Sequence, residues 1–304
     1  MALCLRGETR DLAAAMTLEK ESPCKVNLLL NVLGKRPDGF HELETLMHPV
    51  RLFDRLTFAR AGDSVQLTCS EASLPTDERN LALRAARAFL ETAQISEGVR
   101  VHLEKKIPLA AGLGGGSSNA ACTLLGLNEL FGYALSAHQL HAVAATLGSD
   151  VPFFLQEKPA IATGRGETIR PLEPFLALQG AAFLLIHPGF GVSTAWAYAE
   201  LANFPEALTG KRGRAEHLAD LLKAGDLPAA TPEFYNSLEA PVLKKFPLLA
   251  IFKDFLQDDG AAVALMSGSG STIFGVYRTP SDAKNIERRV RAKFDPCWTI
   301  VVPV

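Results

Sequence analysis

The sequence has few of the features that mark membrane, secreted or nucleic-acid-binding proteins. None of its uninterrupted apolar runs is long enough to cross a bilayer, and residues 1–16 lack the apolar core of a secretory signal. Its 31 Lys and Arg residues nearly balance its 33 Asp and Glu residues, so the net charge is -2 and no basic footprint for nucleic acid is present. We therefore expect a cytoplasmic protein with neither nucleic-acid nor membrane partners.

Cysteine and histidine are sparse as well, and their spacing does not indicate a metal centre. The five cysteines are odd in number, widely scattered and without a Cys-x-x-Cys pair, which excludes a zinc motif or a disulfide framework. His138 and His141 lie one helical turn apart, but no carboxylate or cysteine joins them at ligand spacing. We interpret them as surface histidines.

The commoner phosphate-binding signatures are also missing. No Gly-x-x-x-x-Gly-Lys-Ser/Thr string occurs, which excludes a P-loop. The dinucleotide fingerprint fails because Ser117 stands where the third glycine after Gly112 and Gly114 is required. The His-Arg-Asp catalytic loop of protein kinases is absent.

A different glycine-rich segment is present, and it is the most informative feature of the chain. Residues 108–119 read PLAAGLGGGSSN, between the strand-like 99–107 and an apolar helical run. Glycines let a backbone approach a ligand closely, and the first turn of a helix offers unpaired N–H groups and partial positive charge. Together they form a seat for an anion, most naturally a phosphate chain. The alternative is a flexible loop capped by Ser117 or Ser118.

This loop resembles the ATP loop of the GHMP kinases, and two further segments fit that family in order and spacing. They are residues 22–45, SPCKVNLLLNVLGKRPDGFHELET, and residues 266–277, MSGSGSTIFGVY. The first segment, together with residues 147–154, LGSDVPFF, is similar to the members that phosphorylate a cytidine diphosphate-linked methylerythritol. The resemblance covers most of the chain from Ser22 to Val304.

The resemblance implies an α+β fold of two domains with the active site in the cleft between them. We expect an N-terminal mixed α/β domain over residues 16–172 and a C-terminal, ferredoxin-like split βαβ domain over residues 173–304. The residues themselves indicate a break near 170–180, where prolines interrupt the pattern. After it, the order strand, helices, hairpin, helix, strand is typical of a split βαβ unit. Residues 1–15 match nothing in the family, and we expect them to be an extension.

Two charged residues are the predicted catalytic pair. Asp150 lies in a turn before Pro152, where a carboxylate can project into a cleft, although a solvated loop residue has the same pattern. Lys25 stands at the head of an apolar strand, where it has no packing role, although a strand-end lysine can simply reach water. The resemblance implies that Asp150 acts as general base and that Lys25 is its partner.

The nucleotide contacts follow from the resemblance. It assigns the ATP site to Asn80 and to the glycine-rich loop, although Asn80 also fits a plain helix N-cap. Mg²⁺ should accompany ATP because phosphoryl transfer needs the phosphate charge neutralised, and Ser118 is the candidate ligand. The loop residues are Pro108, Leu109, Ala110, Ala111, Gly112, Leu113, Gly114, Gly115, Gly116, Ser117 and Ser118.

The acceptor contacts follow from the other motifs. Phe40 can stack on a base and His41 can hydrogen-bond to a cytosine edge, although a core Phe beside a surface His is the plainer interpretation. The family often has Tyr at the position of Phe40. Thr194 is either a substrate contact or a helix cap. We expect the serine- and glycine-rich loop to face the glycine-rich loop. The assigned residues are Asn27, Phe40, His41, Thr194, Ser267, Gly268, Ser269 and Gly270.

The resemblance therefore implies an ATP- and Mg²⁺-dependent kinase that phosphorylates the 2-hydroxyl of diphosphocytidyl-methylerythritol in the non-mevalonate isoprenoid pathway. The alternatives are another small-molecule kinase of this family, for homoserine or mevalonate, and a non-catalytic nucleotide-binding regulator. We expect a monomer or a homodimer.

Overall fold

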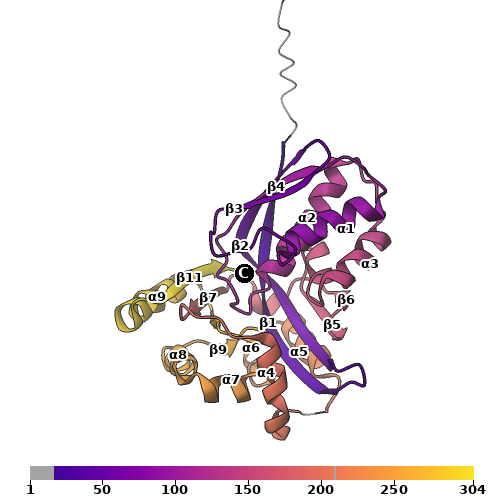
Figure 1. The fold of residues 1–304 in the computed structure, drawn as a ribbon. Helices are drawn as coiled ribbons and strands as arrows, with labels where there is room; N and C mark the ends of the chain where they lie inside the picture. Colours follow the sequence, from indigo (N-terminus) through magenta and orange to yellow (C-terminus); the bar gives the residue numbers. More distant parts are fainter. Residues whose placement is uncertain (1–16, 209) are drawn as a thin grey trace, which may run out of the picture.

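The computed structural model describes residues 17–208 and 210–304, and its strands form two sheets (Figure 1). The expected extension over residues 1–15 lies outside the described residues. The larger sheet has the order β3-β4-β2-β1-β8, with β5 paired to β2 and β6 paired to β5. Its strands are β1 (Thr17–Lys35), β2 (His41–Arg60), β3 (Val65–Cys69), β4 (Val99–Glu104), β5 (Ala160–Gly164), β6 (Thr168–Pro171) and β8 (Tyr235–Asn236).

A long antiparallel hairpin of β1 and β2 forms the middle of this sheet. The apolar run of β1 is buried on both faces around Leu28 and Leu29, as in a strand covered by packing on each side. The connecting turn reverses at Gly39, whose φ of 86° is readily adopted by glycine. Residues 55–60 of β2 have the alternating pattern of a short strand. The rest of β2 is anchored by pairing with β1 and β5, which are distant from one another in sequence.

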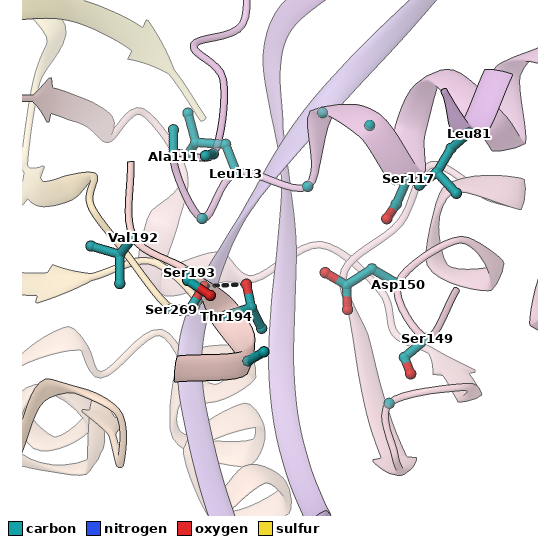
Figure 2. A pocket seen from close by; sticks show the side chains of 18 of the residues that line it. Leu81, Ala111, Leu113, Ser117, Ser149, Asp150, Val192, Ser193, Thr194 and Ser269 are labelled. Carbon is teal, nitrogen blue, oxygen red and sulfur yellow. Dashed lines mark hydrogen bonds between the residues drawn. The ribbon is translucent and has the colours of Figure 1, made fainter. Parts of the chain in front are cut away.

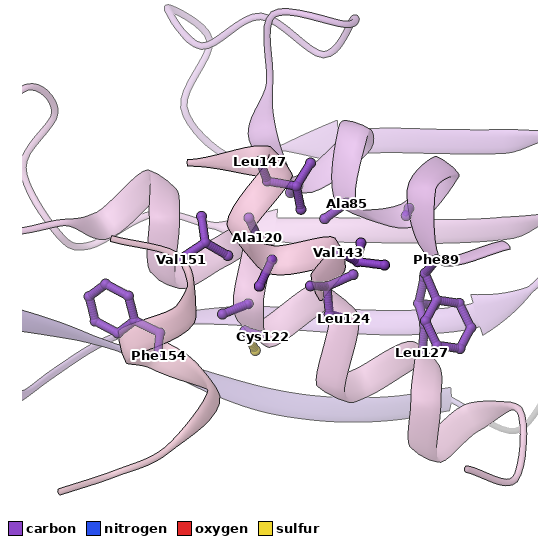
Figure 3. Packing of buried hydrophobic residues seen from close by; sticks show 14 of the residues in the cluster. Ala85, Phe89, Ala120, Cys122, Leu124, Leu127, Val143, Leu147, Val151 and Phe154 are labelled. Carbon is purple, nitrogen blue, oxygen red and sulfur yellow. The ribbon is translucent and has the colours of Figure 1, made fainter. Parts of the chain in front are cut away.

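Two helices pack on one face of the larger sheet, a third packs on these two, and all three bury a common apolar cluster (Figure 3). They are α1 (Leu81–Thr92), α2 (Gly115–Leu130) and α3 (Ala137–Leu147). The N-cap role considered for Asn80 is confirmed, and Ser136 caps α3 in the same way, because their side chains accept hydrogen bonds from Ala82 N and Gln139 N. For α2, the alternative of a cap at Ser117 or Ser118 is wrong. The helix begins at Gly115 with Gly114 as its N-cap, so neither Ser117 nor Ser118 caps it.

The smaller sheet is antiparallel and has the order β11-β7-β10-β9. Numbered within this part of the chain, that order is 4-1-3-2, which confirms the predicted split βαβ arrangement. Its strands are β7 (Ala182–His187), β9 (Val263–Met266), β10 (Ile273–Tyr277) and β11 (Trp298–Pro303), and α8 (Pro247–Asp258) and α9 (Pro280–Phe294) pack on them. The other helices of this half are α4 (Thr194–Glu200), α5 (Arg214–Ala224), α6 (Leu227–Ala230) and α7 (Glu239–Lys245).

The two halves of the chain are joined by more than a linker. The short strand β8 comes from the second half of the sequence and pairs in parallel with β1 of the larger sheet. The boundary between residues 172 and 173 stays a prediction. Short 3₁₀ turns complete the fold: η1 (Pro152–Leu155), η2 (Leu176–Leu178), η3 (Leu201–Asn203), η4 (Pro205–Ala207) and η5 (Thr231–Glu233). None of the helices in the described ranges is long and apolar enough to cross a membrane.

Candidate active site

A cavity of about 1140 Å³ lies where the two sheets meet, and it contains most of the predicted site residues (Figure 2). Strand β1, the β1–β2 turn and the glycine-rich loop line it from one half of the chain, and α4 and the β9–β10 turn line it from the other. A cavity is therefore present between the two halves, where the resemblance implied the active site. The lining includes the predicted residues Lys25, Asn27, Phe40, His41, Asn80, Asp150, Thr194, Gly268 and Ser269, and residues 108–117.

The glycine-rich loop touches the serine-rich β9–β10 turn directly, as the sequence predicted. Ser267 Oγ donates to Gly112 O at 3.0 Å, and Thr272 N donates to Ala111 O at 3.1 Å. Gly112 has a φ of 76°, and a Cβ on it would stand 2.0 Å from Ser267 O. Only glycine fits here, because any side chain would both strain the backbone and separate the two loops.

The start of α2 has the backbone geometry expected of an anion seat. Gly114 adopts the left-handed conformation with a φ of 70° and turns the chain into the helix. Ser118 N is the first amide bonded within the helix, to Gly114 O at 2.9 Å. The preceding amides of residues 115–117 have no earlier helical carbonyl to bond, and all three residues line the cavity. Aligned amides of this kind bind phosphate oxygens.

The Lys25 ammonium lies at the centre of the site and contacts three different segments. Its side chain is only 4% exposed. Its Nζ donates to Asn27 Oδ1 at 2.6 Å and to Gly112 O at 3.2 Å, and it lies 3.5 Å from Asp150 Oδ2. The backbone reinforces this position, because Lys25 N donates to Leu113 O at 3.0 Å. The lysine is therefore not a solvent-reaching strand end, and it faces the predicted base.

Asn27, a predicted contact of the acceptor substrate, is held in one orientation. It lies on the same side of β1 as Lys25, two residues along the strand. Its Nδ2 donates to Thr45 Oγ1 at 2.8 Å, and Thr45 Oγ1 in turn donates to Leu29 O at 2.6 Å. Because its Oδ1 accepts from Lys25, the amide has little freedom to rotate.

Aromatic and cationic side chains form the wall beyond Asp150. Phe40 is 52% exposed, and the Arg165 guanidinium lies 4.8 Å from its ring centroid. The His41 ring lies 5.1 Å from the Tyr198 ring. Burial lowers the pKa of His41, and the charge of Lys35 lowers it further, so the ring is neutral at pH 7. Burial raises the pKa of the Tyr198 hydroxyl, and the negative charge of Asp150 adds to the effect.

Thr194 lies at the opposite side of the cavity and is hydrogen-bonded to the β9–β10 turn. Its Oγ1 and Ser269 Oγ are 2.7 Å apart (Figure 2). Ser193, not Thr194, is the N-cap of α4, because its side chain accepts from Trp196 N. The plain capping role considered for Thr194 is therefore wrong.

Three predicted contact residues lie behind the cavity wall instead of lining it. Ser118 is buried, and its Oγ is 2.7 Å from Ser22 Oγ, which removes the basis for naming it as the Mg²⁺ ligand. Ser267 is buried and uses its hydroxyl to hold the glycine-rich loop. Gly270 packs against Met266, where a Cβ would meet the sulfur at 2.8 Å. These three residues belong to the predicted motifs, but they pack behind the loops and do not line the cavity.

Several lining residues were not predicted from the sequence. Tyr198 and Arg165 reach the cavity from α4 and from the β5–β6 turn. Lys105 also lines it, and its 6% exposed side chain forms an ion pair with the fully buried Asp54. Of these three residues, only Lys105 could have been noticed in the sequence, because it is a charged residue close to the glycine-rich loop. The other two residues are brought in by the tertiary fold.

The described residues contain no group of three or more His, Cys, Asp or Glu side chains that could hold a metal ion. His138 and His141 are exposed, in agreement with their interpretation as surface histidines. Mg²⁺ usually takes one or two protein oxygens and fills its other positions with phosphate oxygens and water. A cavity with one carboxylate, that of Asp150, and several hydroxyls fits an ion that arrives with a nucleotide.

Comparison with known proteins agrees with this geometry. The GHMP kinases N terminal domain model matches residues 80–158, and the GHMP kinases C terminal model matches residues 212–296. The 4-diphosphocytidyl-2-C-methyl-D-erythritol kinase of Syntrophotalea carbinolica is 42% identical over 264 residues, covering 86% of this chain and 90% of that protein. This chain belongs to the GHMP kinases, in the 4-diphosphocytidyl-2-C-methyl-D-erythritol kinase family.

Further members of the family give the same result. The kinase of the same name from Syntrophus aciditrophicus is 44% identical over 268 residues, covering 88% of this chain and 92% of that protein. A crystal structure of 4-(cytidine 5'-diphospho)-2C-methyl-D-erythritol kinase superposes with a TM-score of 0.78 at 37% identity, over 94% of this chain and all of that one. Homoserine kinase from Cytophaga hutchinsonii shares the GHMP fold, with a TM-score of 0.73 at 19% identity over 100% and 97% of the two chains.

Proposed function

We propose that this chain transfers the γ-phosphoryl group of ATP to the 2-hydroxyl of 4-diphosphocytidyl-2-C-methyl-D-erythritol, releasing ADP and the 2-phosphate. The observation that carries the proposal is the position of the Lys25–Asp150 pair. The pair lies beside the amides at the start of α2, and Phe40 and His41 line the same cavity. One end of the cavity therefore suits a triphosphate, and the other suits a nucleobase.

The Lys25–Asp150 pair offers a donor and an acceptor that one substrate hydroxyl can contact together. The 3.5 Å between Lys25 Nζ and Asp150 Oδ2 is longer than a direct charged hydrogen bond. A hydroxyl that bridges the two groups from the cavity side donates a hydrogen bond to the carboxylate and accepts one from the ammonium. Its oxygen attacks the γ-phosphorus, the bond to the bridging oxygen of ADP breaks, and the proton passes to Asp150. Since the transition state is loose, positioning of the hydroxyl contributes more than its deprotonation.

The phosphates of ATP lie along the glycine-rich loop in this proposal. The amides of residues 115–117 and the positive end of α2 stabilise charge that develops on the phosphate oxygens. Mg²⁺ bound with ATP supplies further neutralisation of that charge. The Ser117 hydroxyl, which lines the cavity at the first turn of α2, is the protein oxygen that we assign to the ion in place of Ser118.

The cytidine end of the acceptor lies against the β1–β2 turn. Phe40 offers an exposed ring face for stacking. The His41 ring is neutral at pH 7 and so has one donor and one acceptor nitrogen for the edge of a pyrimidine. Tyr198 packs beside His41 and limits its movement. All of these residues belong to one chain, and the prediction of a monomer or homodimer stays open.

The test is an ADP-release assay with Mg-ATP and a panel of acceptors. The panel contains the diphosphocytidyl-methylerythritol compound, free methylerythritol phosphate, homoserine and mevalonate. We expect turnover with the cytidyl compound alone. Turnover with homoserine or mevalonate would show a GHMP kinase of another specificity. It would refute the proposal that Phe40 and His41 bind the cytidine end of the acceptor. Nucleotide binding without turnover of any acceptor would indicate a non-catalytic regulator.

A further inference from the structure

A single buried carboxylate holds both ends of the glycine-rich loop. Asp54 lies on β2 and is 0% exposed. Its Oδ1 accepts hydrogen bonds from Lys106 N at 2.7 Å and from Ile107 N at 2.9 Å, at the entry to the loop. Its Oδ2 accepts from Asn119 Nδ2 at 2.9 Å, in the helix after the loop. The residues that seat the phosphates lie between these two attachment points.

The same carboxylate holds a cation beneath the loop. Lys105 Nζ bonds to Asp54 Oδ2 and lies 3.3 Å from Asn119 Oδ1. A Cβ on Gly115 would stand 3.3 Å from this ammonium, which places it next to the first turn of α2. A cation at the positive end of a helix is unfavourable, so the paired carboxylate is required to keep it there.

The network also reaches the strand that carries the catalytic lysine. Asn119 Nδ2 donates to Ser22 Oγ at 3.0 Å, and Ser22 Oγ is hydrogen-bonded to Ser118 Oγ at 2.7 Å. Ser22 lies three residues before Lys25 on β1 and is 0% exposed. Through these bonds the position of α2 relative to β1 depends on the carboxylate of Asp54.

We propose that Asp54 is a positioning residue for the nucleotide: it fixes the spacing of the two ends of the glycine-rich loop so that the amides at the start of α2 face the phosphates. The inference rests on the proposed function only in taking ATP as the nucleotide. A carboxylate satisfies this site because four donors converge on its two oxygens. A side-chain amide at this position would place its NH₂ group against the donors Lys105 Nζ and Asn119 Nδ2.

The test compares Asp54→Asn with a control of similar burial. Asp54→Asn keeps the oxygen that accepts from Lys106 N and Ile107 N but turns an NH₂ group toward Lys105 and Asn119. Val101→Ala is the control, because Val101 is fully buried in the same sheet and does not line the cavity. We expect the KM for ATP and the Kd of a non-hydrolysable ATP analogue to rise about tenfold or more in Asp54→Asn. The acceptor KM should change less than twofold, and Val101→Ala should lower only the Tm.

A double variant provides the rescue. Asp54→Asn combined with Asn119→Asp exchanges the carboxylate and the amide across the same contact, and we expect it to regain most of the ATP affinity. An ATP affinity of Asp54→Asn equal to that of Val101→Ala would overturn the proposal, as would an equal rise in both KM values or no recovery in the double variant. Wild-type protein that binds the ATP analogue but phosphorylates no acceptor would refute the proposed function alone, because the binding comparison still tests Asp54.

Discussion

The Lys25 ammonium lies 3.5 Å from the Asp150 carboxylate, although the lysine belongs to the first strand and the aspartate follows the third helix. Lys25 is almost completely buried, whereas the Asp150 side chain is 38% exposed and opens into the cavity. The ammonium is held by Asn27 and Gly112 independently of Asp150. The pair is therefore preorganised on the lysine side, and the carboxylate remains accessible to a substrate hydroxyl.

Asp150→Asn should lower kcat at least about a hundredfold while the nucleotide still binds, because the amide can orient a hydroxyl but cannot take its proton. Steady-state turnover and titration with an ATP analogue measure the two effects separately. Lys25→Met should also lower kcat severely. The double variant of Lys25 and Asp150 should lower kcat by a much smaller factor than the product of the two single factors, since both residues act on one hydroxyl. An unchanged kcat in Asp150→Asn would show that the base lies elsewhere.

His41→Ala should weaken binding of the acceptor substrate more than binding of ATP. The ring lines the cavity beside Tyr198 and belongs to the β1–β2 hairpin, not to the glycine-rich loop or the start of α2. We expect the acceptor KM to rise about tenfold, the scale of one lost hydrogen-bonding contact, with the ATP KM unchanged. Equal losses for both substrates would point to a general distortion of the site.

Arg165→Met should raise the acceptor KM as well, by several-fold. The guanidinium stacks on Phe40 and lines the cavity, and a cation next to an aromatic ring fixes the ring and attracts the phosphates of the acceptor. Arg170→Met is the matched control, because Arg170 lies on β6 of the same hairpin, does not line the cavity and pairs with Glu216. The same KM in both variants would exclude a specific role for Arg165.

Gly112→Ala should lower both the Tm and the affinity for ATP. Its Cβ would collide with Ser267 O at 2.0 Å and would be strained at a φ of 76°, so the two loops must separate. Gly116→Ala is the control for stability, because its Cβ would find its nearest neighbour, Leu81 Cδ1, at 3.8 Å and its backbone is helical. Thermal unfolding of the two variants makes the comparison. Equal Tm values would contradict the close approach of the loops.

His48→Gln should make stability less dependent on pH. Burial lowers the pKa of His48 from 6.5 to about 4, and its Nδ1 donates to Pro49 O at 2.7 Å. Between these values the unfolded chain binds a proton that the folded chain does not, so wild-type stability falls as the pH drops from 6.5 to 4. The loss is on the order of 3 kcal/mol. Urea unfolding across this range should show a smaller slope in His48→Gln, and equal slopes would refute a neutral buried ring.

The sequence determined the local elements and the motifs, because these depend on neighbouring residues. The glycine-rich loop before an apolar run predicted an anion seat. Asn80 and Ser136 are residue types that mark helix starts, since a cap bonds to amides only two or three residues away. Lys25 and Asp150 were predicted only with the help of the family resemblance. Their residue types alone have plainer explanations.

The tertiary structure decided which side chains of each motif face the cavity. Ser117 lines it and Ser118 does not, because the helix rotates adjacent residues by about 100°, and its start at Gly115 sets the direction of each. Arg165 and Tyr198 reach the cavity, and the buried Asp54 reaches both ends of the glycine-rich loop, because segments distant in sequence pack together. Such contacts depend on the whole fold, and no local pattern in the chain encodes them.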